Sequence, residues 1–243
     1  MRDYTEFDKR LRDICVGHAM LDVVGRVDDH AIHRVTLHPD APGPPALVMS
    51  GTHGDEPAGV EAALQFIERA SASHSPFPVV VLPCTNPQGY VSATRENDAG
   101  IDLNWVYDRR DLAEIRAIRE VVRGARYRYV VDLHEDWESP GYYVYELRRN
   151  APYIGDCVST RVAQVCPLNP APIIEGDRAV AGVIHPTPYT ARRASRGSGV
   201  PVALYERHTD HLLTLESPTP SPLQTRVDGH LAGLAAVAAL HDL

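Results

Sequence analysis

The chain has 243 residues, 44% of them hydrophobic, which is enough to fill the core of one α/β domain. Its formal net charge of -8 argues against a nucleic-acid-binding protein, because such proteins present a basic patch. No apolar run reaches the roughly 18 residues of a membrane-spanning helix, and the N-terminus lacks the apolar core of a secretory signal. We therefore expect a cytoplasmic protein with no membrane or nucleic-acid partner.

Hydrophobic periodicity predicts helices and strands that alternate along the chain. The expected helices cover residues 6–16, 58–70, 112–123, 155–165 and 223–240. The expected strands cover residues 21–27, 31–37, 46–49, 79–82, 129–134, 142–146, 200–205 and 212–216. Three tyrosines in 142–146 are expected to lie on both faces of a sheet edge. The alternation favours an α/β protein, a three-layer α/β/α sandwich with a mixed, mainly parallel central sheet.

We expect a single domain over residues 1–243, and nothing in the sequence indicates a repeat or a second domain. Residues 1–40 form an opening helix and strands, 46–219 carry the motifs described below, and 221–243 form a closing helix. The cysteines show no Cys-x-x-Cys pairing, so reduced and partly buried thiols are expected rather than metal ligands. They are Cys15, Cys84, Cys157 and Cys166.

A histidine and a glutamate three residues apart, His53 and Glu56, lie between the expected strand 46–49 and a helix that Pro57 begins. Junctions of this kind often carry functional sites. Catalytic zinc sites use three protein ligands, often two histidines and one glutamate, and leave a fourth position for water. A His-x-x-Glu pair alone is weak, because it occurs by chance in many chains.

The best candidate for a second histidine is His134, which stands where an apolar strand runs into a cluster of polar groups, Asp132-Leu133-His134-Glu135-Asp136. Ligands of α/β proteins sit at the carboxyl ends of parallel strands, so two such ends can bring His53, Glu56 and His134 together. A lone histidine after a strand is more often a surface or capping residue. Whether His134 is a metal ligand therefore depends on the remaining motifs of the chain.

Six motifs occur in an order that resembles the zinc carboxypeptidase superfamily, which includes metallocarboxypeptidases, succinylglutamate desuccinylases and aspartoacylases. They are GTHGDEPAG, TNPQGY, an upstream arginine at Arg95, GIDLNW, DLHED and TLESP. Several motifs in order are far more specific than one, and the resemblance extends over residues 46–219. It implies the α/β/α fold of that superfamily.

The resemblance implies roles for individual residues. His53, Glu56 and His134 resemble the zinc ligands, and Glu216 resembles the general base and acid. Arg95 resembles the arginine that stabilises the oxyanion, a role suited to a permanently charged group with several donors. Taken without the other motifs, Glu216 would be read as a solvated glutamate and Arg95 as a surface arginine.

Around the proposed zinc ligands, Asp102 resembles the carboxylate that orients His53, and Asn104 the asparagine that holds the carboxylate of the substrate. The sequence departs from the pattern at Trp105, where an arginine is usual, so clamping of a C-terminal carboxylate is put in doubt. Trp105 either contacts an apolar substrate group or fills core. Tyr189 is our candidate for the tyrosine that the superfamily often supplies from a loop. The cations that are available to replace the missing arginine are Arg109, Arg110, Arg192, Arg193 and Arg196.

We therefore expect a zinc-dependent amide hydrolase, in the first place a metallocarboxypeptidase that removes the C-terminal residue of a small peptide. The alternative is a deacylase acting on an N-acyl amino acid, and a metal-retaining binding protein without activity is a third hypothesis. An open cleft would favour the peptidase, and a closed pocket lined by arginines would favour the deacylase. Zn²⁺ is the expected cofactor, although Mn²⁺, Co²⁺ or Fe²⁺ suits the same ligands. The sequence indicates neither the preferred side chain nor an oligomeric state.

Overall fold

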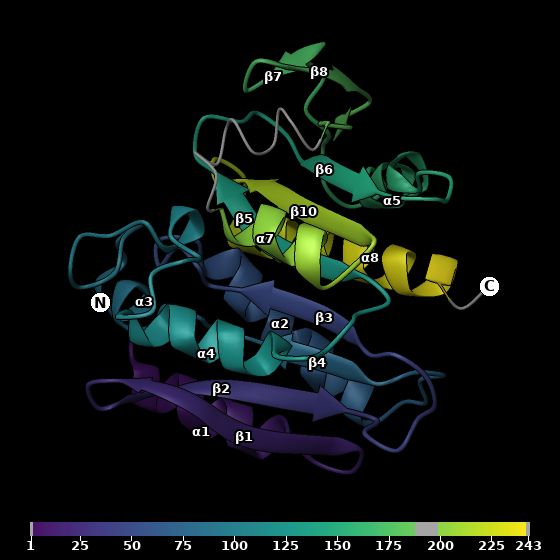
Figure 1. Ribbon diagram of the computed structural model, residues 1–243. Helices are drawn as coiled ribbons and strands as arrows, with labels where there is room; N and C mark the ends of the chain where they lie inside the picture. Colours follow the sequence, from purple (N-terminus) through teal and green to yellow (C-terminus); the bar gives the residue numbers. More distant parts are fainter. Residues whose placement is uncertain (1, 188–198, 242–243) are drawn as a thin grey trace.

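The computed structural model describes residues 2–187 and 199–241, and Figure 1 shows its helices and strands. The helices are α1 (Tyr4–Ile14), α2 (Pro57–Ser71), α3 (Pro87–Ser92), the short 3₁₀ turn η1 (Leu103–Trp105), α4 (Ala113–Val122), α5 (Gly155–Val162), α7 (Val200–Arg207) and α8 (Leu223–His241). The strands are β1 (Ala19–Val27), β2 (His30–Leu37), β3 (Ala46–Ser50), β4 (Val79–Leu82), β5 (Val130–Asp136), β6 (Tyr143–Arg148), β7 (Ile173–Ile174), β8 (Asp177–Val180), β9 (Val183–Ile184) and β10 (His211–Pro218).

The described strands form one mixed sheet in the order β1-β2-β4-β3-β5-β10-β6-β9-β8-β7. At its centre β4, β3, β5 and β10 are parallel neighbours. Antiparallel pairs flank this centre, with β1 and β2 on one side and β6 on the other. The parallel centre matters for function because it gathers the carboxyl ends of β3, β5 and β10 at one edge of the sheet.

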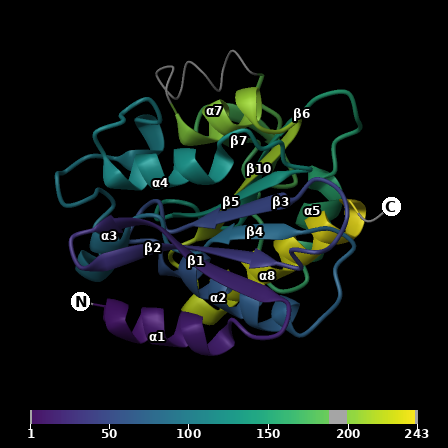
Figure 2. The ribbon, with the colours of Figure 1, turned by 60° about the horizontal axis from the view of Figure 1, so that its bottom comes forward.

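Helices cover both faces of the sheet, as Figure 2 shows, with α4 and α7 on one face and α1, α2 and α8 on the other. Two apolar clusters fill the layers between the helices and the sheet. Successive residues of β3 are divided between them, since Leu47 and Met49 belong to one cluster and Ala46 and Val48 to the other. A strand that is buried on both faces is expected in a parallel sheet covered by helices. The predicted three-layer α/β/α fold is confirmed.

Two sequence predictions are wrong. Residues 200–205, which we expected to form a strand, lie in helix α7, so Tyr205 is a buried helical residue. Valines suggested a strand, but Pro201 in the first helical turn, where no amide donor is needed, and the burial of one apolar face decide for a helix. The tyrosines of 142–146 do not lie at a sheet edge, because β6 pairs with β10 on one side and β9 on the other.

The cysteines are free thiols, of which Cys84 and Cys166 are buried and Cys157 is exposed. Cys84 does not line the cavity described below. Within residues 2–187 and 199–241, no helix has the length and apolar character needed to cross a membrane.

Candidate active site

The candidate site lies where three of the four central parallel strands, β3, β5 and β10, end. His53 and Glu56 belong to the segment between β3 and α2, and Glu56 is the N-cap residue of α2. His134 lies in β5 and Glu216 in the neighbouring strand β10, directly opposite each other in the parallel pairing. Residues separated by up to 163 positions are thus placed together by the sheet itself.

Close backbone packing holds the segment that carries His53. A Cβ atom on Gly54 would lie only 1.8 Å from the carbonyl carbon of Gly89 in α3, so no side chain fits there. Asn86 joins the same two segments, since its Nδ2 donates to Thr52 O at 3.2 Å and its Oδ1 accepts from Gly89 N at 2.9 Å. The TNPQGY motif therefore acts on the site indirectly, by fixing the backbone on which His53 stands.

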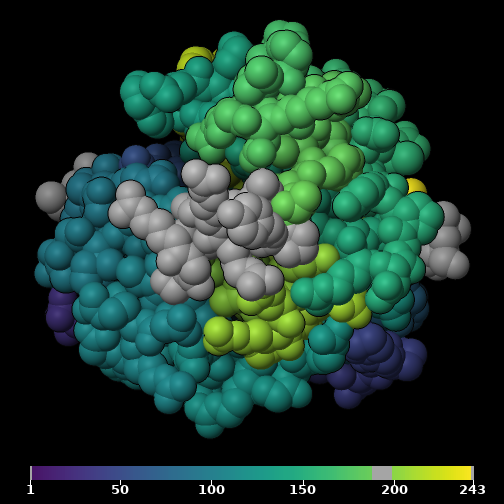
Figure 3. Space-filling model, turned by 45° about the horizontal axis from the view of Figure 1, so that its top comes forward, coloured from purple at the N-terminus to yellow at the C-terminus, as the bar shows by residue number. Residues whose placement is uncertain are grey.

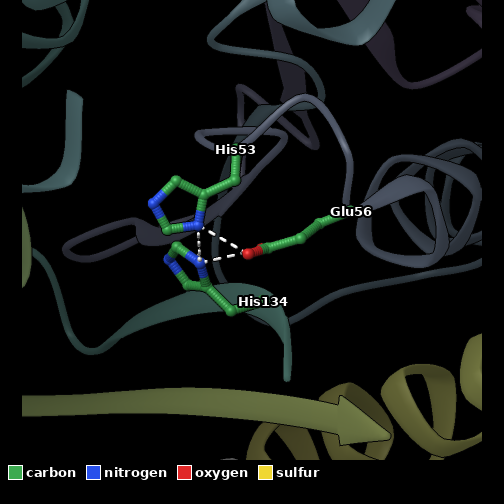
Figure 4. Close-up of side chains that lie close together, drawn as sticks. All are labelled: His53, Glu56 and His134. Atoms are coloured by element: carbon green, nitrogen blue, oxygen red, sulfur yellow. Dashed lines mark hydrogen bonds and ion pairs between the residues drawn. The ribbon is translucent and has the colours of Figure 1, made fainter. Parts of the chain in front are cut away.

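Three side chains converge at this site (Figure 4). His53 Nδ1 lies 2.6 Å from Glu56 Oε1, and His134 Nδ1 lies 3.0 Å from Glu56 Oε2. The two Nδ1 atoms are 3.2 Å apart, and all three side chains are buried. Two imidazole nitrogens and a carboxylate that face one point form a group able to hold a metal ion.

The other ring nitrogen of each histidine faces a carboxylate. His53 Nε2 lies 3.1 Å from Asp102 Oδ1, and His134 Nε2 lies 3.2 Å from Asp132 Oδ2. A carboxylate at Nε2 stabilises the tautomer that carries its proton there, which leaves the Nδ1 lone pair directed toward the other donors. Histidines that bind metals are usually held in this way. The donor set therefore fits a zinc ion.

The charges of these groups shift their proton affinities strongly. Burial would lower the pKa of both histidines, but Glu56 and the outer carboxylates raise it for His53 and raise it further for His134. Burial would likewise raise the pKa of Glu56, yet the two histidines hold it below its usual range. The site thus concentrates negative charge around two imidazoles and stabilises a positive charge between them.

Arg95 and Glu216 complete the polar surroundings of the three converging side chains. Arg95 donates from Nε to Asp102 Oδ2 at 3.0 Å and from an NH group to Glu56 Oε1 at 3.5 Å, so it adjoins the cluster from the side of Asp102. Glu216 is partly exposed, and desolvation raises its pKa to about 8. A carboxylate with a raised pKa is a stronger base in its ionised form.

A cavity of about 370 Å³ is lined by the three converging side chains together with Arg95 and Glu216. Asn104, nine-tenths buried, and Trp105, 36% exposed, both line it, so Trp105 does not simply fill the core. The cavity continues away from His134 along the strands, over Thr214 and Leu212 of β10 and over the aromatic residues of β6. A substrate can thus contact the converging histidines and the sheet surface together.

Among the described residues that line the cavity, Arg95 is the one arginine or lysine. Arg109 instead pairs with Asp111 on the surface, and Arg110 lines a separate cavity beside α4. The remaining candidates lie outside the described residues, as does the candidate tyrosine Tyr189. They are Arg192, Arg193 and Arg196.

Two positioning residues were not recognised in the sequence. Asp132 stands two residues before His134, so both side chains lie on the same face of β5, and this spacing was the available signal. Glu135 accepts a hydrogen bond from Ala58 N at 2.6 Å and pairs with Arg226 of α8. It therefore fixes the first turn of α2, next to Glu56. No local pattern connects Glu135 to Arg226, because 91 residues separate them.

Comparisons with known proteins agree with this geometry. The family model "Succinylglutamate desuccinylase/Aspartoacylase catalytic domain" matches residues 42–154, which include His53, Glu56 and His134. No curated protein sequence matches the chain.

Solved structures share the fold at low sequence identity. A proposed metallopeptidase from Shewanella baltica OS155 is 20% identical, with a TM-score of 0.80 over 98% of this chain and 90% of that one. A metallo-carboxypeptidase from Burkholderia cenocepacia is 16% identical, with a TM-score of 0.71 over 99% and 69%. Carboxypeptidase A from Helicoverpa armigera is 16% identical, with a TM-score of 0.70 over 100% and 75%. The family match and the shared fold together confirm the resemblance of this chain to the zinc carboxypeptidase-like superfamily.

Proposed function

We propose that this protein is a zinc-dependent amide hydrolase and, more specifically, a metallocarboxypeptidase that removes the C-terminal residue of a peptide. The observation that carries the proposal is the convergence of His53, Glu56 and His134, with Glu216 on the adjoining strand. Two histidines, one ligand glutamate and a second glutamate nearby are the groups that metal-assisted hydrolysis requires.

His53 and His134 would hold Zn²⁺ through Nδ1, and Glu56 through its carboxylate. A bound Zn²⁺ supplies Lewis acidity, which polarises a carbonyl group and makes water a better nucleophile near neutral pH. Asp102 and Asp132 keep the Nε2 proton on each histidine, so the Nδ1 lone pairs stay available.

Glu216 acts on protons in this proposal. Its ionised carboxylate takes a proton from the attacking water and later passes it to the leaving nitrogen, so the amine departs neutral. The desolvation that raises its pKa makes it a better acceptor for the first transfer. Arg95, held between Asp102 and Glu56, donates hydrogen bonds to the oxygen that gains negative charge as the carbonyl carbon becomes tetrahedral.

The lining of the cavity favours a peptidase over a deacylase of anionic N-acyl amino acids. Such a deacylase must bind two or more carboxylates, which calls for several cations. Arg95 is the one permanent cation among the described lining residues, and this proposal already assigns it to the oxygen that gains negative charge. Asn104 remains as a neutral group that can bind the single carboxylate of a C-terminus.

The deacylase is the second candidate because the family match favours it. The matching model describes desuccinylases and aspartoacylases, and it covers the segment that contains His53 and His134. Its substrates would be small N-acyl amino acids rather than peptides.

Hydrolysis restored by metal to the chelated protein separates these candidates. The protein is stripped of metal, reloaded with Zn²⁺, Mn²⁺ or Co²⁺, and given peptides with free or amidated C-termini and a set of N-acyl amino acids. A carboxypeptidase releases single residues from free C-termini only. Preference for N-acyl amino acids would favour the deacylase, and no hydrolysis with bound zinc would contradict both.

A further inference from the structure

Among the described residues, carboxylates strongly outnumber cations in the lining of the cavity beside His53. Seven carboxylates line it, against one arginine among the described residues. Two of the seven, Glu56 and Glu216, belong to the proposed reaction. The other five carboxylates would repel a substrate with an anionic side chain, so their partners and positions indicate which substrates the cavity can bind.

Two of the remaining carboxylates have partners that explain them. Glu135 pairs with Arg226 and accepts a hydrogen bond from the first turn of α2. Asp136 accepts from the backbone of Glu138 and from the hydroxyl of Tyr143, so it holds the loop after β5. Of the other three, Glu138 is exposed, and the remaining two carboxylates lie at one turn of the sheet.

Those two carboxylates are Glu175, the first central residue of the tight turn between β7 and β8, and Asp177, the first residue of β8. The turn has positive φ at both central residues, 48° at Glu175 and 87° at Gly176, as hairpin turns of two residues require. Figure 3 views the molecule from the side on which the green segment with β7 to β9 and the yellow-green helix α7 lie. Both elements contribute residues to the cavity wall.

Tyr145 links this turn to the reacting groups. Its hydroxyl donates to Glu175 Oε2 at 3.1 Å, and in β6 it is paired with Thr214, two residues before Glu216 in β10. Burial raises the pKa of Tyr145, and the charges of Glu175 and Glu216 raise it further, so both carboxylates act on the same ring. Tyr145 therefore connects the turn that carries Glu175 with the part of β10 that carries Glu216.

The cavity lining also has an apolar part. Leu147 of β6, Leu212 of β10 and Val202 of α7 belong to it together with Pro186, and Leu147 and Leu212 form a strand pair two residues from that of Tyr145 and Thr214. A cavity with both apolar side chains and carboxylates suits a side chain that has an alkyl stem and a charged end, as lysine and arginine have.

We propose that the cavity selects a positively charged side chain, and that the enzyme preferentially releases C-terminal lysine or arginine. Glu175 and Asp177 bind the cationic end, and the stem lies against the apolar part of the cavity lining. This inference rests on the proposed peptidase function and assigns its substrate class, which is opposite in charge to the substrates of a desuccinylase or aspartoacylase.

Matched substrates test the charge alone. N-benzoylglycyl-arginine is compared with N-benzoylglycyl-citrulline, which has nearly the same shape without the charge, and the lysine compound with its norleucine analogue. We expect kcat/KM to be roughly tenfold higher for the cationic member of each pair at low ionic strength. The preference should shrink as salt is added, because Glu175 is exposed and its charge is screened. Equal rates within both pairs would overturn the proposal.

Matched variants test the residues. Replacing Glu175→Gln together with Asp177→Asn should remove most of the preference for arginine over citrulline, because kcat/KM should fall much more for the arginine compound than for the citrulline compound. Glu68→Gln on the exposed surface of α2 is the control and should change neither rate. An arginine preference that survives in the double variant would show that other groups confer it.

Failure of the proposed function can be told from failure of this inference. Hydrolysis of all the peptides without a charge preference would overturn only the substrate class. If no peptide is cleaved, the peptidase function fails, and calorimetric binding of benzoylglycyl-arginine and benzoylglycyl-citrulline still decides the charge selectivity. Equal affinity for the two compounds would overturn the inference on its own.

Discussion

His134 of β5 and Glu216 of β10 lie opposite each other in a pair of parallel strands. Their backbones are one strand spacing apart, about 4.8 Å, and the pairing fixes which way each side chain points. A proposed metal ligand and the proposed base are thus positioned by the central sheet rather than by loops. Sites on regular elements hold their geometry well when one side chain is replaced, which makes single substitutions informative.

Glu216→Gln should abolish turnover without releasing the metal. Glutamine fills nearly the same volume but cannot accept the proton of the attacking water, so we expect kcat to fall by at least about 100-fold. Metal content, measured by mass spectrometry, should stay at one ion per chain because Glu216 is not among the three converging ligands. Glu68→Gln serves as the control, and a variant that hydrolyses as fast as the parent would disprove the role of Glu216.

His134→Ala should remove stoichiometric zinc binding. One of three protein donors is lost, and the remaining pair on the segment before α2 cannot enclose an ion by itself. The measurement is the zinc content after dialysis against a defined free zinc concentration. His74→Ala, which replaces an exposed histidine outside the site, should leave zinc content unchanged. Zinc retained by the His134 variant would reject this ligand assignment.

Asp132→Asn should weaken zinc binding and leave the site assembled. Asparagine is neutral at the position facing His134 Nε2, so it no longer favours the tautomer with the lone pair on Nδ1. Loss of such a partner typically costs about 10- to 100-fold in metal affinity. Competition with a zinc-binding dye gives the dissociation constant, and activity should return at saturating zinc. An unchanged dissociation constant would show that Asp132 does not orient His134.

Local patterns in the sequence were sufficient for most of the fold. The strand 79–82 was predicted with its observed bounds. Helix α2 is longer than predicted by one residue at each end, and β3 is longer by one residue at its C-terminal end. These elements have a strong apolar period or an uninterrupted β-branched run, so local and tertiary preferences agree. In α7 the two preferences conflict. Valine favours a strand there, whereas packing against β10 and η1 decides for a helix, and no local pattern reveals that packing.

The site could be predicted in part for a similar reason. His53 and Glu56 stand in one short motif, and His134 at the end of an apolar strand, so their residue types and positions are informative together. Glu175 and Asp177 come from the small hairpin of β7 and β8, whose strands of two and four residues are too short to leave a clear periodic signal. Their arrival at the cavity depends on how β8 and β9 pair beside β6, which is a property of the sheet as a whole.

A buried polar cluster at the other end of β10 should make the fold sensitive to acid. His211 Nε2 lies 2.8 Å from Glu146 Oε1, and His211 Nδ1 lies 2.8 Å from His241 Nε2 in α8. The carboxylate of Glu146 also accepts hydrogen bonds from the backbone amides of Ile154 and Gly155. Strand β6, strand β10 and two helices are therefore joined through one set of side chains.

Burial, followed by the charge of His211, lowers the pKa of His241 to about 4, and burial also lowers that of His211. A histidine in the unfolded chain has a pKa of about 6.5, so below this pH the unfolded chain binds more protons than the folded chain. The free energy of unfolding therefore decreases as the pH is lowered from about 6.5 to 4. The lowered pKa of Glu146 acts in the same direction at lower pH, because its stabilising charge is lost on protonation.

The melting temperature should therefore fall by a few degrees, about 3 °C or more, between pH 7.5 and pH 5. Circular dichroism of the wild type and of His241→Gln at both values measures this. Glutamine can still hydrogen-bond to His211 but does not titrate, so the variant should lose less stability on acidification than the wild type. His74→Gln, an exposed histidine, should keep the full pH dependence. If all three proteins lose the same number of degrees, His241 does not contribute to the acid sensitivity, and the source must lie among other buried groups.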